Sequence, residues 1–269
     1  MKFIILSENR DNDCFIGEAG LSIYLEKNEN KFILDTGCSD LFLKHASILN
    51  INIDNVDTVV LTHGHNDHTG GLPYLIGNKR IIMHPECFKD RYSKRRKEYV
   101  GCPISKEELN TKHNLILTKD SYEIFKDIFY LGEIPMIIDF EQDGNFSTTL
   151  DSELTKKDLT EDDSGIAIKT NNGLVIMTGC GHRGICNTIE QAKKVTNENR
   201  IYAVLGGFHL RDLEKQKEKI NKTIKYFEEN SIKHLYLGHC ITNDVIEYFK
   251  NNTNIEIHEL KTGKEFNIE

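Results

Sequence analysis

The segment at residues 59–71, "VVLTHGHNDHTGG", gathers ligand-type side chains directly after an apolar run. A strand is predicted to end at Thr62, and the side chains that follow it are those of His63, His65, Asp67 and His68. Imidazole and carboxylate groups suit Zn²⁺ or iron, and a compact turn can present several of them to one point or to two neighbouring points. Gly64 relaxes the backbone so that the rings on either side of it can face one ion. The pattern predicts a metal site.

The order of the four residues bears on the number of ions. Asp67 and His68 are adjacent at the start of a predicted helix, so their side chains point in different directions and would reach different ions. The alternative is a polar surface loop that is rich in histidine by chance. Four ligand-type residues placed directly at a strand end disfavour that alternative.

A second segment, residues 174–184, reads "LVIMTGCGHRG" and places a cysteine and a histidine after another apolar run. Cys180 is either a metal ligand at a strand end or a small buried hydrophobic residue. His182 lies two residues further on and can face the same side if the backbone stays extended. Its alternative role is a cap near a helix that begins around Ile185.

Strands and helices must position these residues. In the first third of the chain, short β-branched or apolar runs predict strands within 2–6, 20–26, 31–37 and 56–64, and helical spacing appears at 41–50. Later, runs at 165–170 and 174–179 flank the turn dipeptide Asn172-Gly173, as in a β-hairpin.

The last hundred residues continue this alternation. Predicted strands at 201–207 and 232–238 flank a charged helix whose apolar face is formed by Leu213, Ile220, Ile224 and Phe227. Alternating strands and helices predict an α/β protein whose sheets are covered by helices. Residues 85–160 are irregular and polar, and no linker separates them, so we expect a single domain over 1–269 with 85–160 as an inserted lid or subdomain.

Composition restricts the partners and the compartment. A net charge of -8 argues against a general nucleic-acid or acidic-membrane binder, which needs a positive face. No window approaches the roughly 18 apolar residues of a membrane span, and the first apolar run is too short for a secretory signal. Seven scattered cysteines favour buried thiols or metal ligands in a reducing compartment. We expect a cytoplasmic protein with no nucleic-acid or membrane partner, and a homo-oligomer stays open.

The motifs together resemble the metallo-β-lactamase fold superfamily. They are the H-x-H-x-D-H pattern, "LDTG" before it, and ligand-type residues at later strand ends. The resemblance covers nearly the whole chain and implies an αββα sandwich, with two mixed sheets covered by helices and one or two metals at one edge. The segments "GEAGLS", "TGCGHRGI", "GGFHL" and "GHC" are similar to a branch typified by archaeal dihydropterin ribofuranosylaminobenzene phosphate synthase and many bacterial relatives.

This resemblance implies roles for individual residues. Relatives with two metals place one ion on a pair matching His63 and His65 and the other on a pair matching Asp67 and His68. A later Asp or Cys matches Cys180, and a last histidine matches His239. The resemblance implies two divalent ions, which we expect to be Zn²⁺, with Fe or Mn as the other candidates.

Asp35 of "LDTG" corresponds to a carboxylate that orients a ligating imidazole, as metal-bound histidines usually require; its alternative role is that of a strand-end turn former. The G-H-T-x-G histidine of many relatives is absent, because this chain reads "LTEDDSGIAIKT" there. No histidine lies between His113 and His182, so His182 is the economical replacement, with Asp162 or Asp163 as the alternatives.

Further residues are candidates for substrate contact. His209 in "GGFHL" follows a predicted strand and could act as a general acid, a substrate contact or an extra ligand, or be a surface histidine. Glu8, Asn9 and Glu18 lie in early segments that match the branch. Residues 89–97 hold six basic residues against one acid, which either attract a phosphate or carboxylate or form a solvated helix face. The basic residues named as candidates for substrate binding are Arg95, Arg96 and Lys97.

We therefore predict a metal-dependent hydrolase in which a metal-activated water attacks an ester, lactone or phosphoester of a small anionic molecule. Asp67 would hold the second ion and guide the proton of the water. The alternative is a lyase or transferase resembling the synthase, in which the metals act as Lewis acids and the basic residues hold a phosphate. A second alternative is an iron-dependent redox enzyme, because a thiolate beside the metals suits iron as well as zinc.

Overall fold

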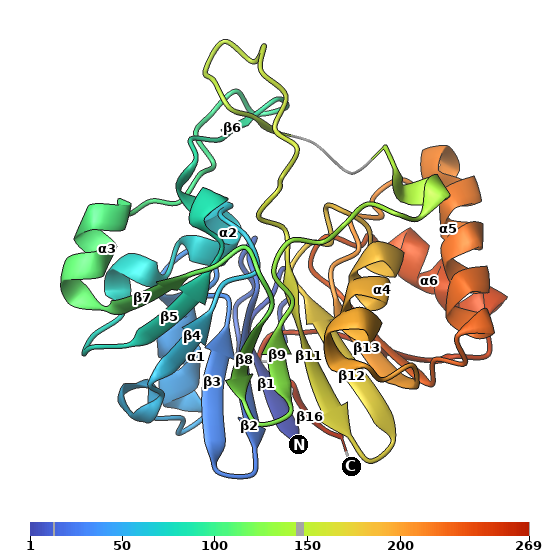
Figure 1. Ribbon diagram of the computed structural model, residues 1–269, viewed down its shortest axis with the longest axis horizontal. Helices are drawn as coiled ribbons and strands as arrows, with labels where there is room; N and C mark the ends of the chain where they lie inside the picture. Colours follow the sequence, from blue (N-terminus) through green and yellow to red (C-terminus); the bar gives the residue numbers. More distant parts are fainter. Residues whose placement is uncertain (13, 144–147, 269) are drawn as a thin grey trace. The chain divides into compact units, whose positions relative to one another are not determined.

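The computed structural model describes residues 1–12, 14–143 and 148–268. The chain divides into two compact units (Figure 1). The first unit comprises Met1–Lys119, Phe146–Asp162 and Lys261–Ile268. The second unit comprises Asp120–Asn145 and Asp163–Leu260.

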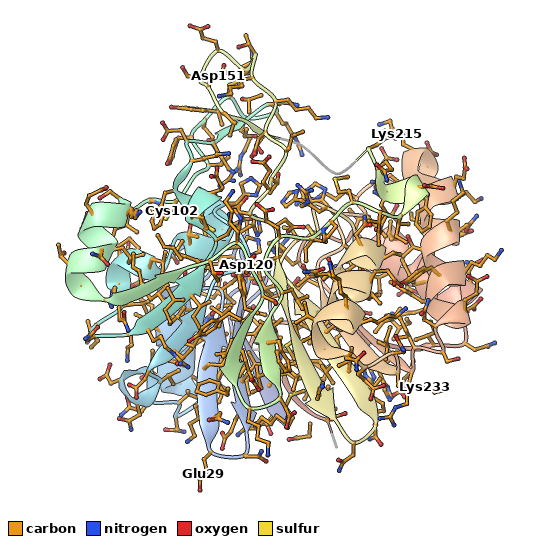
Figure 2. The ribbon with its side chains drawn as sticks, viewed as in Figure 1. Glu29, Cys102, Asp120, Asp151, Lys215 and Lys233 are labelled. Atoms are coloured by element: carbon orange, nitrogen blue, oxygen red, sulfur yellow. The ribbon has the colours of Figure 1, made fainter. Side chains whose placement is uncertain are left out.

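The first unit contains a mixed seven-stranded sheet in the order β16-β1-β2-β3-β4-β5-β7. Its antiparallel part consists of β16 (Glu265–Asn267), β1 (Lys2–Ser7), β2 (Ser22–Lys27) and β3 (Asn30–Leu34). Glu29, labelled in Figure 2, marks the turn between β2 and β3. The parallel part continues from β3 through β4 (Thr58–Val60), β5 (Arg80–Met83) and β7 (Asn114–Leu117). Since β3 and β4 are parallel neighbours, the residues that follow them meet at one edge of the sheet.

Helices and short 3₁₀ turns lie in the segments that connect the strands of this sheet. The helices are α1 (Leu41–Ile48), α2 (Asn66–Thr69) and α3 (Lys106–Lys112). The 3₁₀ turns are η1 (Ile53–Asn55), η2 (Leu72–Tyr74) and η3 (Pro85–Phe88). Phe42 of α1 and Leu109 of α3 are buried in one core with apolar residues of β3, β4 and β5. This core anchors the strand ends that carry the histidine-rich turn.

A short two-stranded pairing joins distant parts of the first unit. β6 (Tyr92–Ser93) pairs antiparallel with β10 (Thr148–Thr149). The predicted lid or subdomain at 85–160 therefore contributes η3, β6, α3, β7 and β10 to the first unit, and other strands to the second. Residues 144–147 of that stretch lie outside the described residues, and the single domain with an inserted lid stays a prediction.

The second unit contains another mixed seven-stranded sheet, in the order β15-β14-β13-β12-β11-β9-β8. Its antiparallel strands are β8 (Tyr122–Phe125), β9 (Ile128–Tyr130), β11 (Gly165–Thr170) and β12 (Gly173–Thr178). Its parallel strands continue from β12 through β13 (Ile201–Gly206), β14 (His234–Leu237) and β15 (Glu256–Glu259). The register pairs Thr170 with Gly173, which confirms the predicted hairpin.

Three helices lie along one side of this sheet, as Figure 1 shows within the second unit. They are α4 (Ile185–Thr196), α5 (Leu213–Glu229) and α6 (Asn243–Asn252), and η4 (Asp139–Glu141) precedes them in the chain. The apolar face predicted for α5 is confirmed, since Ile220, Ile224 and Phe227 are buried and Leu213 packs against the same core. The Asp212 side chain caps this helix by accepting a hydrogen bond from the Lys215 amide at 3.0 Å.

The predicted fold class is confirmed, because the chain forms two mixed sheets flanked by helices. The strands predicted in the first third and in the last hundred residues are present. Among the described residues, none of the helices has the length and apolar character needed to cross a bilayer.

Candidate metal centre

Asp35 organises the turn that follows β4. Its Oδ1 accepts a hydrogen bond from the Thr62 amide at 2.7 Å, and its Oδ2 accepts one from Thr62 Oγ1 at 2.7 Å. The Asp35 backbone is left-handed, with φ of 57°, and its carbonyl oxygen accepts the Ser22 hydroxyl at 2.8 Å. These contacts hold a buried carboxylate at the strand edge where the histidines begin.

The same carboxylate sets the orientation of His68. Asp35 Oδ2 lies 2.7 Å from His68 Nδ1, so that nitrogen carries a proton and donates it. The Nε2 of His68 is therefore an acceptor, and it lies 3.8 Å from Asp67 Oδ1. The His68 imidazole is buried, whereas the Asp67 side chain is 27% exposed. This arrangement offers one imidazole nitrogen and one carboxylate oxygen side by side.

His63 is oriented through Thr62. Because Thr62 Oγ1 donates its hydrogen to Asp35, it accepts from His63 Nδ1 at 3.0 Å. The lone pair of His63 is then on Nε2. The His63 ring packs against the His68 ring, with centroids 4.1 Å apart and planes tilted by 48°. One carboxylate thus fixes the tautomers of two histidines, directly for His68 and through a hydroxyl for His63.

His65 is oriented from a different part of the first unit. Its Nε2 donates to Thr148 Oγ1 at 3.3 Å, and that hydroxyl donates to Asp158 Oδ2 at 2.8 Å. The lone pair of His65 is therefore on Nδ1, which lies 3.0 Å from His63 Nε2. Two lone pairs at this separation repel each other unless a cation lies between them. The donor set fits a metal ion bound by His63 Nε2 and His65 Nδ1.

Arg91 braces the backbone of this turn. It is fully buried, with Nη2 2.6 Å from Asp162 Oδ1 and Nε 2.8 Å from Asp158 Oδ2. Asp162 Oδ2 accepts the Gly64 amide at 2.7 Å. A Cβ at residue 64 would clash with the Cys87 carbonyl oxygen, so only glycine fits between the two histidines. Both oxygens of Asp162, an alternative ligand in the sequence, are thus engaged by Arg91 and the turn.

Charge pairing shifts the pKa values in this brace. Burial opposes a charged Asp158, but Arg91 and hydrogen bonds from Thr160 and Thr148 outweigh it and lower the pKa of that carboxyl. Burial likewise opposes a charged Arg91, and the two aspartates outweigh it and raise the pKa of the guanidinium. The guanidinium and Asp158 are charged together.

The remaining basic residues of segment 89–97 are arranged differently. Lys89 pairs with Glu86 and Glu161, and Arg96 pairs with Glu98 at 2.7 Å. Arg95, Arg96 and Lys97 are exposed. Substrate binding by these three residues stays a prediction. The exposed positive charge of segment 89–97 is smaller than its composition indicates, because Arg91 is buried and paired with Asp158 and Asp162.

The early candidates make contacts of their own. The buried Glu8 accepts from the Arg10 amide at 2.7 Å and from Arg10 Nη1 at 3.1 Å. Asn9 Oδ1 accepts the Gly20 amide at 3.3 Å. The Glu18 carboxylate accepts the Ser39 hydroxyl at 2.6 Å and so tethers the loop after β3. Substrate contact by Glu8 and Asn9 stays a prediction.

The second unit assembles its own candidates at the ends of β12 and β14. The Cys180 sulfur, the Cys240 sulfur and a ring nitrogen of His239 all lie within 4.8 Å of one another, and the three residues are buried. His239 has a left-handed backbone, with φ of 54°. Cys240 Sγ donates to the Cys180 carbonyl oxygen at 3.5 Å. A thiol, a second thiol and an imidazole are a donor set that suits zinc or iron.

His182 and His209 form a buried pair in the second unit, with ring centroids 4.5 Å apart. Burial lowers the pKa of His209 well below its usual value, and the nearby His182, Arg211 and His239 lower it further. The His209 amide donates to Cys240 Sγ at 3.2 Å. Asp163, the other alternative ligand, accepts the Arg183 amide at 2.8 Å through Oδ2. His182 is not the cap of α4, because Gly184 holds that position.

Sequence reasoning did not include some residues that shape these sets. Cys240 directly follows His239, so its position beside a ligand candidate was a usable signal. Thr148 and Asp158 carry no such signal. Thr148 lies in the short pairing of β10 with β6, and Asp158 is linked to His65 through the Thr148 hydroxyl. The structure brings Asp35, His63, His65, Asp67 and His68 together in the first unit, and the second unit holds Cys180, His182, His209 and His239.

Comparisons with known proteins identify relatives of this chain. The model of the metallo-beta-lactamase superfamily matches residues 16–86. The chain is 31% identical to 7,8-dihydropterin-6-methyl-4-(beta-D-ribofuranosyl)-aminobenzene-5'-phosphate synthase of Methanocaldococcus jannaschii, over 94% of this chain and 91% of that protein. A crystal structure described as a metal-dependent hydrolase of the beta-lactamase superfamily has a TM-score of 0.87 and 30% identity, covering 100% of this chain and 99% of the other.

A more distant solved structure, Zn²⁺-bound PqqB from Methylobacterium extorquens, is 13% identical with a TM-score of 0.61, covers 100% of both chains, and shows the fold alone. The matches to the two relatives near 30% identity cover almost the full length of this chain and of each relative. From its fold, its histidine-rich turn and these relatives, the chain belongs to the metallo-β-lactamase superfamily.

Proposed function

We propose that this protein is a metal-dependent hydrolase that cleaves an ester, lactone or phosphoester bond of a small anionic molecule. The family is one of metal-dependent enzymes, and one relative at 30% identity is described as a metal-dependent hydrolase. We further propose that two divalent ions, with zinc as the first candidate, are held by His63, His65, Asp67, His68, Cys180, His182 and His239.

The observation that carries this proposal is the pair of imidazole nitrogens 3.0 Å apart in the first unit. Each ring donates its other N–H to a hydroxyl that itself donates to a buried aspartate. A protein that only needed two packed rings would not require both outer nitrogens to be fixed in this way. The arrangement supports a cation at His63 and His65.

When bound, the ions would lower the pKa of a water molecule and polarise the substrate oxygen. The protein's own groups would do the rest. Asp67 is partly exposed, so it can accept a proton from the attacking water while Asp35 keeps His68 in position. His209 is neutral near pH 7 because burial lowers its pKa, so it can donate a hydrogen bond to the substrate through its ring N–H, but it does not carry the extra proton that a general acid needs.

Metal analysis combined with a substrate panel tests this function. We expect about two equivalents of divalent metal after reconstitution, and turnover on a phosphodiester, a lactone or a thioester. Asp67→Asn should abolish turnover, whereas Asp57→Asn, an exposed site before β4, should leave it unchanged. A protein that stays metal-free and inactive after reconstitution contradicts the proposal.

The second candidate is a lyase or transferase reaction like that of the synthase, which the 31% identity over 94% of the chain favours. In that reaction a pterin would condense with a phosphoribosylated aromatic amine, and Arg95, Arg96 and Lys97 would hold the phosphate. Replacing these three residues by alanine should then raise the KM for the phosphorylated substrate. An unchanged KM would remove the basic segment from the substrate site.

The identity of the bound metal distinguishes the third candidate function, that of an iron-dependent redox enzyme, from the first two. The thiols of Cys180 and Cys240 beside His239 suit iron as well as zinc. An iron absorption band in anaerobically purified protein would favour redox chemistry. Cytoplasmic location and the lack of a nucleic-acid partner stay predictions from composition. A small anionic substrate stays a prediction from the basic segment at residues 89–97.

A further inference from the structure

A separate group of ligand-type side chains lies on two neighbouring strands of the second unit. His234 begins β14, and Glu256 and His258 lie on β15. The strands are parallel, and the register pairs His234 with Glu256 and Tyr236 with His258. Lys233, labelled in Figure 2, marks the end of β14 at which this group lies. His239 follows the opposite end of β14, so the group is distinct from the centre proposed above.

The three side chains present their ligand atoms to one another. His234 Nδ1 lies 3.3 Å from His258 Nε2 and 3.2 Å from Glu256 Oε2. His258 Nε2 lies 3.3 Å from Glu256 Oε1. A tetrahedral ion with ligand distances of about 2.0–2.2 Å separates its ligand atoms by roughly 3.4 Å. The two ring nitrogens are separated as in a tetrahedral site, each is close to one of the two Glu256 oxygens, and one ligand atom of each residue lies within 4.8 Å of the others.

Aromatic packing holds both rings in this position. His258 stacks on Tyr236, with centroids 4.4 Å apart and planes within 14°. His234 packs against Tyr202 at 4.8 Å. Rings fixed by packing lose little conformational freedom when they bind an ion, which lowers the entropic cost of binding. The imidazoles are 20% and 24% exposed and Glu256 is 62% exposed, so an ion can reach them from solvent.

We propose that His234, Glu256 and His258 bind one divalent transition-metal ion of the zinc class, with water completing the coordination. Two imidazoles and a carboxylate form a ligand set that suits zinc, nickel and copper better than it suits magnesium or calcium. A surface site of this kind on a superfamily enzyme would bind an ion that takes no part in the reaction.

Zinc titration of chelator-stripped full-length protein by calorimetry tests this site. Glu256→Gln and His258→Ala should each weaken one class of sites by more than about tenfold, since losing a ligand costs at least as much as losing a hydrogen-bond partner of a ligand. Glu259→Gln is the matched control, because that carboxylate is on the same strand but pairs with Lys250 at 2.6 Å. The control should bind zinc as the wild type does.

Ring ¹⁵N shifts provide a second readout that does not depend on the centre at residues 63–68. Zinc should shift the nitrogens of His234 and His258 in the wild type and in His63→Ala, and much less in Glu256→Gln. The proposal is wrong, and the group is only an ion-paired cluster, if two results are found together. Glu256→Gln and His258→Ala would bind the same number of zinc equivalents as the Glu259→Gln control with the same affinities, and zinc would not shift the ring nitrogens of His234 and His258. Loss of metal only in His63→Ala would concern the proposed hydrolase centre instead.

Discussion

At the scale of single residues, Asp35 fixes the histidine tautomers of the first unit. Replacing it by asparagine removes the charged acceptor at 2.7 Å from His68 Nδ1 and the acceptor of the Thr62 hydroxyl. We expect Asp35→Asn to weaken metal binding roughly 10- to 100-fold, measured by competition with a chelator. Asp40→Asn, which alters only a surface pair with Lys44, is the control. Equal affinities in both variants would show that Asp35 serves the turn and not the metal.

The residues of the centre differ in how far sequence could predict them. His63, His65, Asp67 and His68 are adjacent in the chain, so their proximity follows from local backbone alone. Asp35 becomes their neighbour because β3 and β4 are parallel and adjacent, which strand patterns indicate. Asp158 lies 93 residues beyond His65, and only the tertiary fold brings it there through Thr148.

At the scale of elements, Arg91 ties the segment after β5 to residues 158–162 and to the histidine-rich turn at residues 63–68. Arg91→Met would leave Asp158 and Asp162 buried without their charge partner. We expect a loss of about 3–5 kcal/mol in the free energy of unfolding, measured by urea denaturation. Arg96→Met, at an exposed pair with Glu98, should change it by less than about 1 kcal/mol. Comparable losses in the two variants would contradict the assignment of Arg91 as a buried brace.

The same brace gives a dependence on acid. The pKa of Asp158 is lowered in the folded protein from 3.8, so its charged form stabilises the fold above that pH. Stability is lost as the pH falls from about 3.8 through the folded pKa, by about 1.4 kcal/mol per pH unit for one proton. Between pH 2 and 5, the free energy of unfolding should depend less on pH in Asp158→Asn than in the wild type, measured by urea denaturation at each pH. An identical pH profile would contradict a charged Asp158.

Elements with strong local signals were predictable, and those defined by long-range pairing were not. The hairpin at Asn172-Gly173 combines a turn dipeptide with two apolar runs, and α5 has a clear apolar face. The strands β6 and β10 have two residues each, too few for any periodicity. They exist because each supplies the hydrogen-bonding partner of the other, across more than fifty residues of chain.

At the scale of the whole molecule, metal binding should stabilise the folded chain. An ion that binds only the folded state adds about 2.7 kcal/mol when its free concentration is 100 times the Kd. We expect chelation to lower the Tm and zinc to restore it, measured by calorimetry. His63→Ala should reduce this response, because it removes one of the paired nitrogens. A Tm that does not respond to chelator in metal-loaded wild-type protein would contradict a bound ion.

The resemblance to a superfamily predicted the fold class of the whole chain because the motif residues at strand ends require a particular order of strands. It could not predict how residues 85–160 are shared, since α3 and β7 belong to the first unit and β8 and β9 to the second. Polar segments without a regular period leave that division to tertiary packing. The reaction itself also depends on the groups around the centre and not on the fold.

Anomalous scattering at the zinc and iron absorption edges, from crystals of the reconstituted protein, would locate and identify the ions of the proposed centre. We expect one peak bonded to His63 Nε2 and His65 Nδ1, and a second bonded to Asp67 and His68 Nε2. The energy of the edge would identify each ion. The absence of any peak at His63 and His65 in metal-saturated crystals would show that these two histidines do not bind a metal ion.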